Sequence, residues 1–157
     1  MPPPVILDPG QLNTSKVVFD KEHIRNHNPQ RHEFDLLDAI VHFDVEARIF
    51  AGYHDVRDDA WWVRGHVPGR ALFPGVLMIE IAAQLASFVT HEVLQDDRFF
   101  GFGGVDAVKF RGAVEPPCRL IVIGRAREIK LRRMICETQG FVDGVMVFEA
   151  VITGMAV

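Results

Sequence analysis

One stretch, from Gly75 to Leu94, limits what this chain can fold into more than any other. Its apolar residues would point in nearly every direction around a helix, and a helix that is apolar all round must be buried all round. We therefore expect one long helix here, with the rest of the chain packed around it. The polar exceptions fall at offsets that place them on a single stripe of that helix: Glu80, Gln84, Ser87 and His91.

The same region contains the only candidate for a membrane span, from Leu72 to Val89. Pro74, Glu80 and Gln84 interrupt it, which favours a buried helix of a soluble protein. The N-terminus has neither the basic start nor the long apolar run of a signal peptide. The two cysteines lie in no metal or redox motif. Together these features predict a cytoplasmic protein with no membrane contact.

The remaining pattern predicts an antiparallel sheet around that helix. Asp20 is expected to be the N-cap of a short helix that stops before Pro29. A tight hairpin turn is expected at Asp143-Gly144. Runs of apolar residues predict two strands before the long helix and four after it, at 34–43, 47–54, 102–114, 119–128, 131–142 and 145–153. This order predicts the α+β class, with a single domain at 20–157 and an extended or disordered N-terminal arm at 1–19.

Charge is spread unevenly along the chain. The formal net charge of -4 gives no general attraction to nucleic acid, and no nucleic-acid partner is expected. Residues 98–133, however, contain nine basic and three acidic side chains. Two interpretations stay open for this segment: a docking surface for an acidic partner, or the solvated faces of strands.

Three residues near the start of the long helix could take part in acid–base chemistry: a histidine, a glycine and a glutamate. His66 lies in a loop rich in glycine and proline, which either holds its imidazole in place or leaves it as an ordinary surface histidine. Glu80 is a carboxyl on an apolar helix, either a proton donor or a structural residue with a hydrogen-bonding partner. Gly75 has no Cβ, so a ligand oxygen could approach its N–H at the helix start. These parts favour proton abstraction next to a carbonyl, combined with protonation of a leaving group.

The other histidines give weaker signals. His23 and His27 are spaced i, i+4, and His32 follows. No carboxylate motif accompanies them and Pro29 breaks the helix before His32, so we expect no metal site. The fingerprints of phosphate and dinucleotide binding are absent from the sequence, and no cofactor is expected. Ser87 and His91 either assist the chemistry or only satisfy the polar stripe of the helix.

The run around His66 and Glu80 resembles the signature of FabZ-type 3-hydroxyacyl-[acyl-carrier-protein] dehydratases. The matching residues, with the spacing of that family, are Gly65-His66-x-Pro68-Gly69, Pro74-Gly75-Val76-Leu77-x-x-Glu80 and Ala83-Gln84. Weaker matches flank this motif at Asn28-Pro29-Gln30-Arg31, 34–38, Gly104-Val105-Asp106-x-x-Lys109-Phe110-Arg111 and Val142-Asp143-Gly144-Val145. The resemblance covers roughly residues 20–155.

The resemblance implies a hotdog fold, an antiparallel sheet wrapped around one long helix. It also implies elimination of water from (3R)-3-hydroxyacyl chains on acyl carrier protein in fatty acid or related acyl chain biosynthesis, without metal or cofactor. His66 would take the proton, Glu80 would protonate or orient the departing hydroxyl, and the Gly75 N–H would hold the thioester oxygen. The remaining substrate contacts would come from Phe73, Pro74, Val76 and Gln84. The site would straddle a homodimer, and trimers of dimers are common in the family.

Three departures from the family pattern concern the substrate rather than the chemistry. Val67 replaces a phenylalanine, Gln30 replaces a histidine, and the run Phe99-Phe100-Gly101-Phe102 stands where tyrosines are common near the acyl tunnel. Glu80, where a related dehydratase–isomerase branch has aspartate, favours a simple dehydratase. The alternatives are a hotdog acyl thioesterase, an enoyl-CoA hydratase, and a non-catalytic acyl-binding paralogue.

Overall fold

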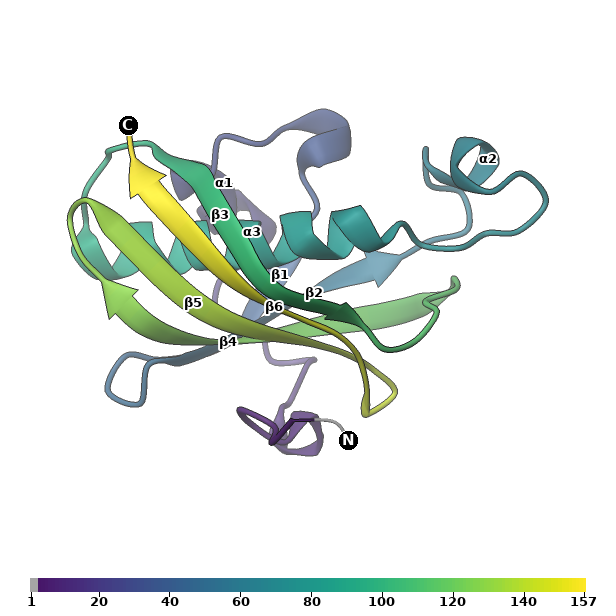
Figure 1. Cartoon of the computed structure of the whole chain (residues 1–157), viewed down its shortest axis with the longest axis horizontal. Coiled ribbons are helices and arrows are strands. Elements are labelled where there is room, and N and C mark those ends of the chain that lie inside the picture. Colours follow the sequence, from purple (N-terminus) through teal and green to yellow (C-terminus); the bar gives the residue numbers. More distant parts are fainter. Residues whose placement is uncertain (1–2) are drawn as a thin grey trace.

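The computed structural model describes residues 3–157 and consists of a six-stranded antiparallel sheet curled around one long helix (Figure 1). The strand order is β1-β2-β4-β5-β6-β3. The helices are α1 (Lys21–His27), α2 (Val63–His66) and α3 (Gly75–Leu94), with short 3-10 turns at Pro9–Gln11 and His32–Phe34. The strands are β1 (Ala39–Asp44), β2 (Ile49–Val56), β3 (Phe100–Phe110), β4 (Cys118–Ile129), β5 (Arg133–Val142) and β6 (Val145–Ala156). The predicted α+β class and hotdog arrangement are confirmed.

The long helix α3 has the predicted bounds and forms the centre of the core. Ile81, Leu85 and Phe88 are fully buried in one cluster with Leu120 and Phe148 of the sheet. By length and composition α3 is the one helix within residues 3–157 that could cross a membrane, but 61% of its most apolar window is buried inside the fold. That is the pattern of a core helix.

One face of α3 is open, so the prediction of burial on all sides is wrong. Val76 is 70% exposed, and Ile79, Glu80, Ala83 and Ser87 are partly exposed. These positions follow each other at helical spacing along one side of α3. The sheet of a single chain covers the rest of the helix and leaves this largely apolar stripe uncovered.

The first strand begins later than its apolar pattern suggests. It was expected at 34–43 but runs from Ala39 to Asp44. The backbone amides of Leu36 and Leu37 both donate to the Gln84 side chain on α3. Because this side chain satisfies those amides, the segment does not join the sheet there.

The hairpins follow their turn residues. The β1–β2 turn takes Ala47 out of the predicted second strand, since the Ala47 amide donates to the Asp44 side chain and Arg48 has a φ of 58°. The expected turn at Asp143-Gly144 is confirmed: both residues have positive φ, as a two-residue hairpin of the right twist requires.

Asp20 caps α1 as expected, accepting a hydrogen bond from the His23 amide (2.9 Å).

The N-terminal arm lies against the sheet on the side opposite α3 (Figure 1). The Ile6 amide donates to Gln139 Oε1 (2.8 Å), and Gln139 Nε2 donates to the Pro4 carbonyl (3.0 Å). Ile6, Leu7 and Leu12 pack against a small buried cluster formed by Val41, Ala51, Ile123 and Phe141. The described part of the arm therefore covers apolar strand residues that would otherwise face water.

Most of the basic side chains at 98–133 are already paired within the chain. Arg125 and Arg127 both bind Glu137, and Arg133 and Lys130 both bind Glu128. Similar ion pairs join Arg98 to Asp96, Arg111 to Glu149 and Arg119 to Asp55. This pairing supports the interpretation of solvated strand faces over that of a free docking surface.

Candidate active site

His66 is held at the end of a short helix that the sequence did not reveal. Its amide donates to the carbonyl of Trp62 (2.9 Å), which precedes α2. Trp62 is buried, and its ring meets the ring of Phe73 edge to face at 5.2 Å. The Phe73 amide in turn donates to the Val114 carbonyl (2.8 Å). The segment that carries His66 is thus anchored to the core at both ends.

A single hydrogen bond determines which nitrogen of His66 is free. Nδ1 lies 2.8 Å from the Leu72 carbonyl oxygen. Because a carbonyl only accepts, Nδ1 carries the proton, and the neutral ring keeps its lone pair on Nε2. The residue is exposed in the single chain. A fixed imidazole with a free Nε2 is suited to accept a proton from a ligand.

The first turn of α3 lies beside His66 and is suited to a negatively charged oxygen. Its N-cap is Pro74, no side chain caps this end, and the first turn contains no acidic residue. The backbone amides here therefore favour an anion. A Cβ on Gly75 would come within 2.8 Å of the Phe110 ring, so any larger residue here would have to displace that ring.

Two hollows flank this helix end, and His66 lines both. One, of about 240 Å³, is also lined by Phe73, Gly75 and Phe110. The other, of about 470 Å³, is mostly apolar and is bordered by Trp61, Trp62, Pro74 and Val76. The predicted contact residues Phe73, Pro74, Gly75 and Val76 are therefore gathered around His66.

Glu80 lies elsewhere on the chain, in a separate cavity of about 160 Å³. Gln30 and Ser87 line this cavity on its polar side. Its apolar walls come from the start of β3 and from neighbouring strands: Phe99, Phe100, Phe102, Met134 and Ile152. The phenylalanine run that departs from the family pattern thus forms the wall of the cavity that Glu80 lines.

Gln84 holds Glu80 in place. Its Nε2 donates to Glu80 Oε1 (2.9 Å) and to the Phe34 carbonyl (2.7 Å), while its Oε1 accepts from the amides of Leu36 and Leu37 (3.2 Å each). Two donors and two acceptors are the full capacity of a glutamine amide. Although Gln84 was expected to contact substrate, the hydrogen-bonding groups of this buried side chain are all used within the fold.

His91 also serves the fold. It is 5% exposed, and its two ring nitrogens lie 2.8 Å and 2.7 Å from the carbonyl oxygens of Ser87 and Arg98. The Ser87 hydroxyl is 3.4 Å from the same ring. His91 therefore ties the end of α3 to the segment that leads into β3.

Three residues near the two parts of the site were not among the predicted site residues. Trp62 and Phe110 shape the surroundings of His66 and Gly75. Gln30 Oε1 is buried beside Glu80 and has no hydrogen-bond partner within residues 3–157. Its departure from the Pro-His-Arg pattern was the available signal for Gln30. Phe110 lies in a segment that resembles the family, but neither this match nor the adjacent tryptophans indicated a role at the site, because those roles depend on packing.

Comparisons with known proteins identify similar sequences and similar folds. A family model described as a FabA-like domain matches residues 28–151. The 3-hydroxyacyl-[acyl-carrier-protein] dehydratase FabZ of Nitratidesulfovibrio vulgaris (strain DP4) is 30% identical over 151 residues, covering 94% of this chain and 94% of that protein.

Similar solved structures establish the fold. The dehydratase heterocomplex ApeI:P from Xenorhabdus doucetiae gives a TM-score of 0.73 at 14% identity, over 85% of this chain and 90% of that one. A mutant thioesterase from Pseudomonas aeruginosa gives a TM-score of 0.68 at 16% identity, over 89% and 95% of the two chains. The hotdog fold is therefore shared by dehydratases and thioesterases, and the side chains of the site must distinguish them.

Proposed function

The chain belongs to the family of FabA-like domains, and from that premise we propose that it is a 3-hydroxyacyl-[acyl-carrier-protein] dehydratase. It removes water from (3R)-3-hydroxyacyl chains on acyl carrier protein and releases trans-2-enoyl chains, as a cytoplasmic step of fatty acid biosynthesis. The observation that carries this proposal is the free Nε2 of His66 beside the uncapped start of α3.

The elimination assigns one role to each group. The Nε2 atom of His66 takes a proton from C2 of the acyl chain, and the electron pair of that C–H bond moves toward the thioester carbonyl. The Gly75 N–H stabilises the charge that develops on the thioester oxygen. As the C3–O bond breaks, the Glu80 carboxyl gives its proton to the departing hydroxyl, so water and the C2–C3 double bond form together.

The active site draws on two chains. Within one chain His66 lines the hollows at the start of α3 while Glu80 lines a separate cavity, so a second copy has to bring its His66 to this Glu80. The open stripe of α3 at Val76, Ile79 and Ala83 provides an apolar surface for that contact. Strand β3 is at the edge of the sheet, and pairing two copies of β3 would continue the sheet across a dimer. Three such dimers would form the larger assembly that is common in the family.

The lining of the cavity at Glu80 supports the proposal that the substrate is an acyl chain. Much of its wall is aromatic or aliphatic. Its polar lining comes from Glu80, Gln84 and Ser87 on α3, from Gln30 before α3 in the chain, and from Thr153 on β6. An apolar slot with a few polar groups near the reacting carbon is the usual design for binding an acyl chain. Gln30, with its unpaired carbonyl oxygen, would contact the 3-hydroxyl or the carrier-linked end of the chain.

A hotdog thioesterase is an alternative function, since a solved thioesterase shares this fold. A thioesterase adds water to the thioester carbonyl and releases a free thiol, whereas the dehydratase leaves the thioester intact. A non-catalytic acyl-binding paralogue would do neither. The placement of His66 beside the Gly75 amide favours abstraction of the C2 proton over both alternatives.

Incubation with 3-hydroxyacyl-acyl-carrier-protein separates these activities. Enoyl product is followed by mass spectrometry and free thiol by a colorimetric reagent, for the wild type, His66→Ala and Glu80→Gln. We expect enoyl product without thiol, and a loss of at least about a hundredfold in each variant. Thiol release without enoyl product would establish a thioesterase, and equal rates in all three proteins would refute the assigned residues.

A further inference from the structure

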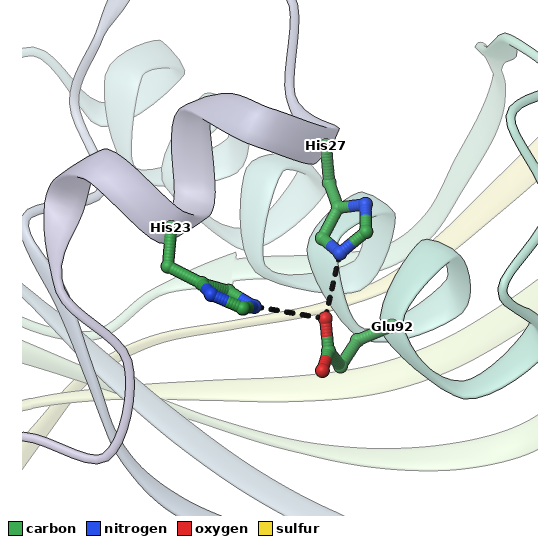
Figure 2. Close-up of side chains that lie close together, drawn as sticks. All are labelled: His23, His27 and Glu92. Atoms are coloured by element: carbon green, nitrogen blue, oxygen red, sulfur yellow. Dashed lines mark hydrogen bonds and ion pairs between the residues drawn. The ribbon is translucent and has the colours of Figure 1, made fainter.

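A second cluster of reactive side chains lies outside the proposed active site. His23 and His27 point from α1 toward Glu92 on α3 (Figure 2). The His27 Nε2 atom lies 2.6 Å and the His23 Nε2 atom 3.1 Å from the same carboxylate oxygen, Oε2. The three ligand atoms lie within 4.8 Å of one another. Two imidazoles and one carboxylate thus converge on a single point.

The fold brings these side chains together in a defined way. The spacing i, i+4 places both imidazoles on one face of α1. The chain directly after α1 is fastened to α3, since Asn28 Nδ2 donates to the Gln84 carbonyl (2.9 Å). The ring of Phe88 on α3 meets both imidazoles near edge to face, at 5.9 Å and 5.6 Å.

The cluster has an apolar back and an open front. Phe19 stacks on the His23 ring at 4.6 Å, and together with Phe88 it holds the imidazoles from the core side. The side chains of His23, His27 and Glu92 keep 39%, 19% and 17% of their surface exposed. An ion from solvent can therefore reach the point where they meet.

We propose that His23, His27 and Glu92 form a binding site for one divalent transition-metal ion, with Zn²⁺ as the ion that best fits the donor set. Two imidazole nitrogens and one carboxylate oxygen are characteristic zinc ligands, and a water molecule would complete a tetrahedron. Ligands at about 2.0–2.1 Å in a tetrahedron lie about 3.4 Å apart. The donor atoms here need shifts of about 1 Å or less to reach that spacing, within the rotamer freedom of partly exposed side chains.

Hard cations suit the cluster poorly. Ca²⁺ and Mg²⁺ prefer six or more oxygen ligands, whereas a single carboxylate is present among these three side chains. The competing explanation is a simple ion-pair cluster in which the imidazoles bind Glu92 directly and no metal enters. In that explanation both imidazoles donate to the same oxygen, Oε2, and the cluster takes up no ion, so the protein would show no saturable binding of Zn²⁺.

The ion would join two distant parts of the chain. Glu92 is 69 residues from His23 and 65 from His27 in sequence, so the complete ligand set exists only in the folded state. An ion that binds only the folded state stabilises it. Glu92 is three helical turns beyond Glu80, about 18 Å along the axis of α3. The site is therefore structural and independent of the proposed dehydratase chemistry.

The full-length protein, stripped with a chelator, provides the first test. Titration with Zn²⁺ should show one equivalent bound per chain, and Co²⁺ should give the visible absorption of a four-coordinate site. At an ion concentration of about a hundred times Kd, the unfolding midpoint should rise by about 5–10 °C. Mg²⁺ and Ca²⁺ should give no shift. Absence of saturable binding of Zn²⁺ and Co²⁺ to the wild type would overturn the proposal without any variant.

Single replacements then locate the site. His23→Gln, His27→Gln and Glu92→Gln should each weaken Zn²⁺ binding at least tenfold and remove most of the rise in the unfolding midpoint. His32→Asn is the matched control, because it removes an exposed imidazole at a positive φ of 57° that asparagine tolerates. Unchanged binding in the three variants would place the ion elsewhere and refute the site.

The test also stays separate from the proposed function. Below the unfolding temperature, enoyl formation should be equal with and without Zn²⁺. A protein that binds Zn²⁺ at this cluster but forms no enoyl product would refute only the dehydratase. An active dehydratase without saturable Zn²⁺ binding would refute only the metal site.

Discussion

Replacing Gln84 with leucine would test how the fold holds the carboxyl of Glu80. Leucine keeps roughly the volume of glutamine and removes all four hydrogen bonds of the amide. The Leu37 amide would be left buried without a partner, at about 1–3 kcal/mol for an unsatisfied group. The Leu36 amide would keep its hydrogen bond to the Phe34 carbonyl (3.1 Å). The Phe34 carbonyl belongs to an exposed residue and can turn to water.

This loss amounts to about 1–3 kcal/mol of unfolding free energy. For a domain of this size the unfolding midpoint should fall by about 2–12 °C, as followed by circular dichroism. Because Glu80 also loses its donor, kcat should fall about tenfold or more at a temperature where the variant is folded. The prediction therefore couples a stability defect to a catalytic defect.

Gln139→Leu is the matched control for this experiment. Gln139 is also buried, but its side chain binds the backbone of the N-terminal arm, at Pro4 and Ile6, far from the proposed site. We expect a smaller loss of stability and an unchanged kcat. If Gln84→Leu were as stable and as active as the wild type, the assigned hydrogen-bond network would be wrong.

Two further substitutions follow from the same structure. Gly75→Ala places a Cβ 2.8 Å from the Phe110 ring and should lower kcat/KM about tenfold or more. The double variant with Phe110→Leu should regain part of the lost kcat/KM. Full activity of the single variant would contradict the need for close approach of the substrate at Gly75. Burial raises the pKa of Asp38, but its hydrogen bonds to His54 and Lys21 outweigh burial and hold the pKa below 3.8. Asp38 then contributes stability at neutral pH that is lost as pH falls through 3.8 toward its folded-state pKa, because the unfolded chain binds the proton first. Urea unfolding should show Asp38→Asn destabilised near neutral pH, with the difference shrinking below pH 3.8; a constant difference would contradict the assignment.

The features that the sequence predicted well are local ones. The bounds of α3 follow from its apolar run and the Pro74-Gly75 start, and the turn at Asp143-Gly144 follows from residues that accept positive φ. The N-cap at Asp20 is read from a single residue type. Each depends on neighbours within a few positions, so one sequence is enough.

The features that it missed depend on contacts between distant residues. The late start of β1 is caused by Gln84, 47 and 48 residues from the amides that it binds. The His23–His27 pair looked unsuited to a metal because no carboxylate accompanied it, yet the fold supplies Glu92 from α3. The exposed stripe of α3 was invisible for a related reason: an apolar helix face looks the same in sequence whether it meets its own sheet or a second chain.

The central claim is that His66 of one chain works with Glu80 of another. It can be tested by co-expressing His66→Ala and Glu80→Gln chains with different affinity tags and purifying the mixed dimer. Each parent homodimer should be inactive. The mixed dimer contains one site with both residues intact, so it should recover about half of the wild-type rate per dimer.

One enoyl-formation assay on the mixed dimer therefore tests whether the two residues of a site come from different chains. Recovery to about half of the wild-type rate is the predicted result. A mixed dimer as inactive as its parents would contradict the shared site, because a site contained in one chain cannot be rebuilt from two chains that each lack one of its residues.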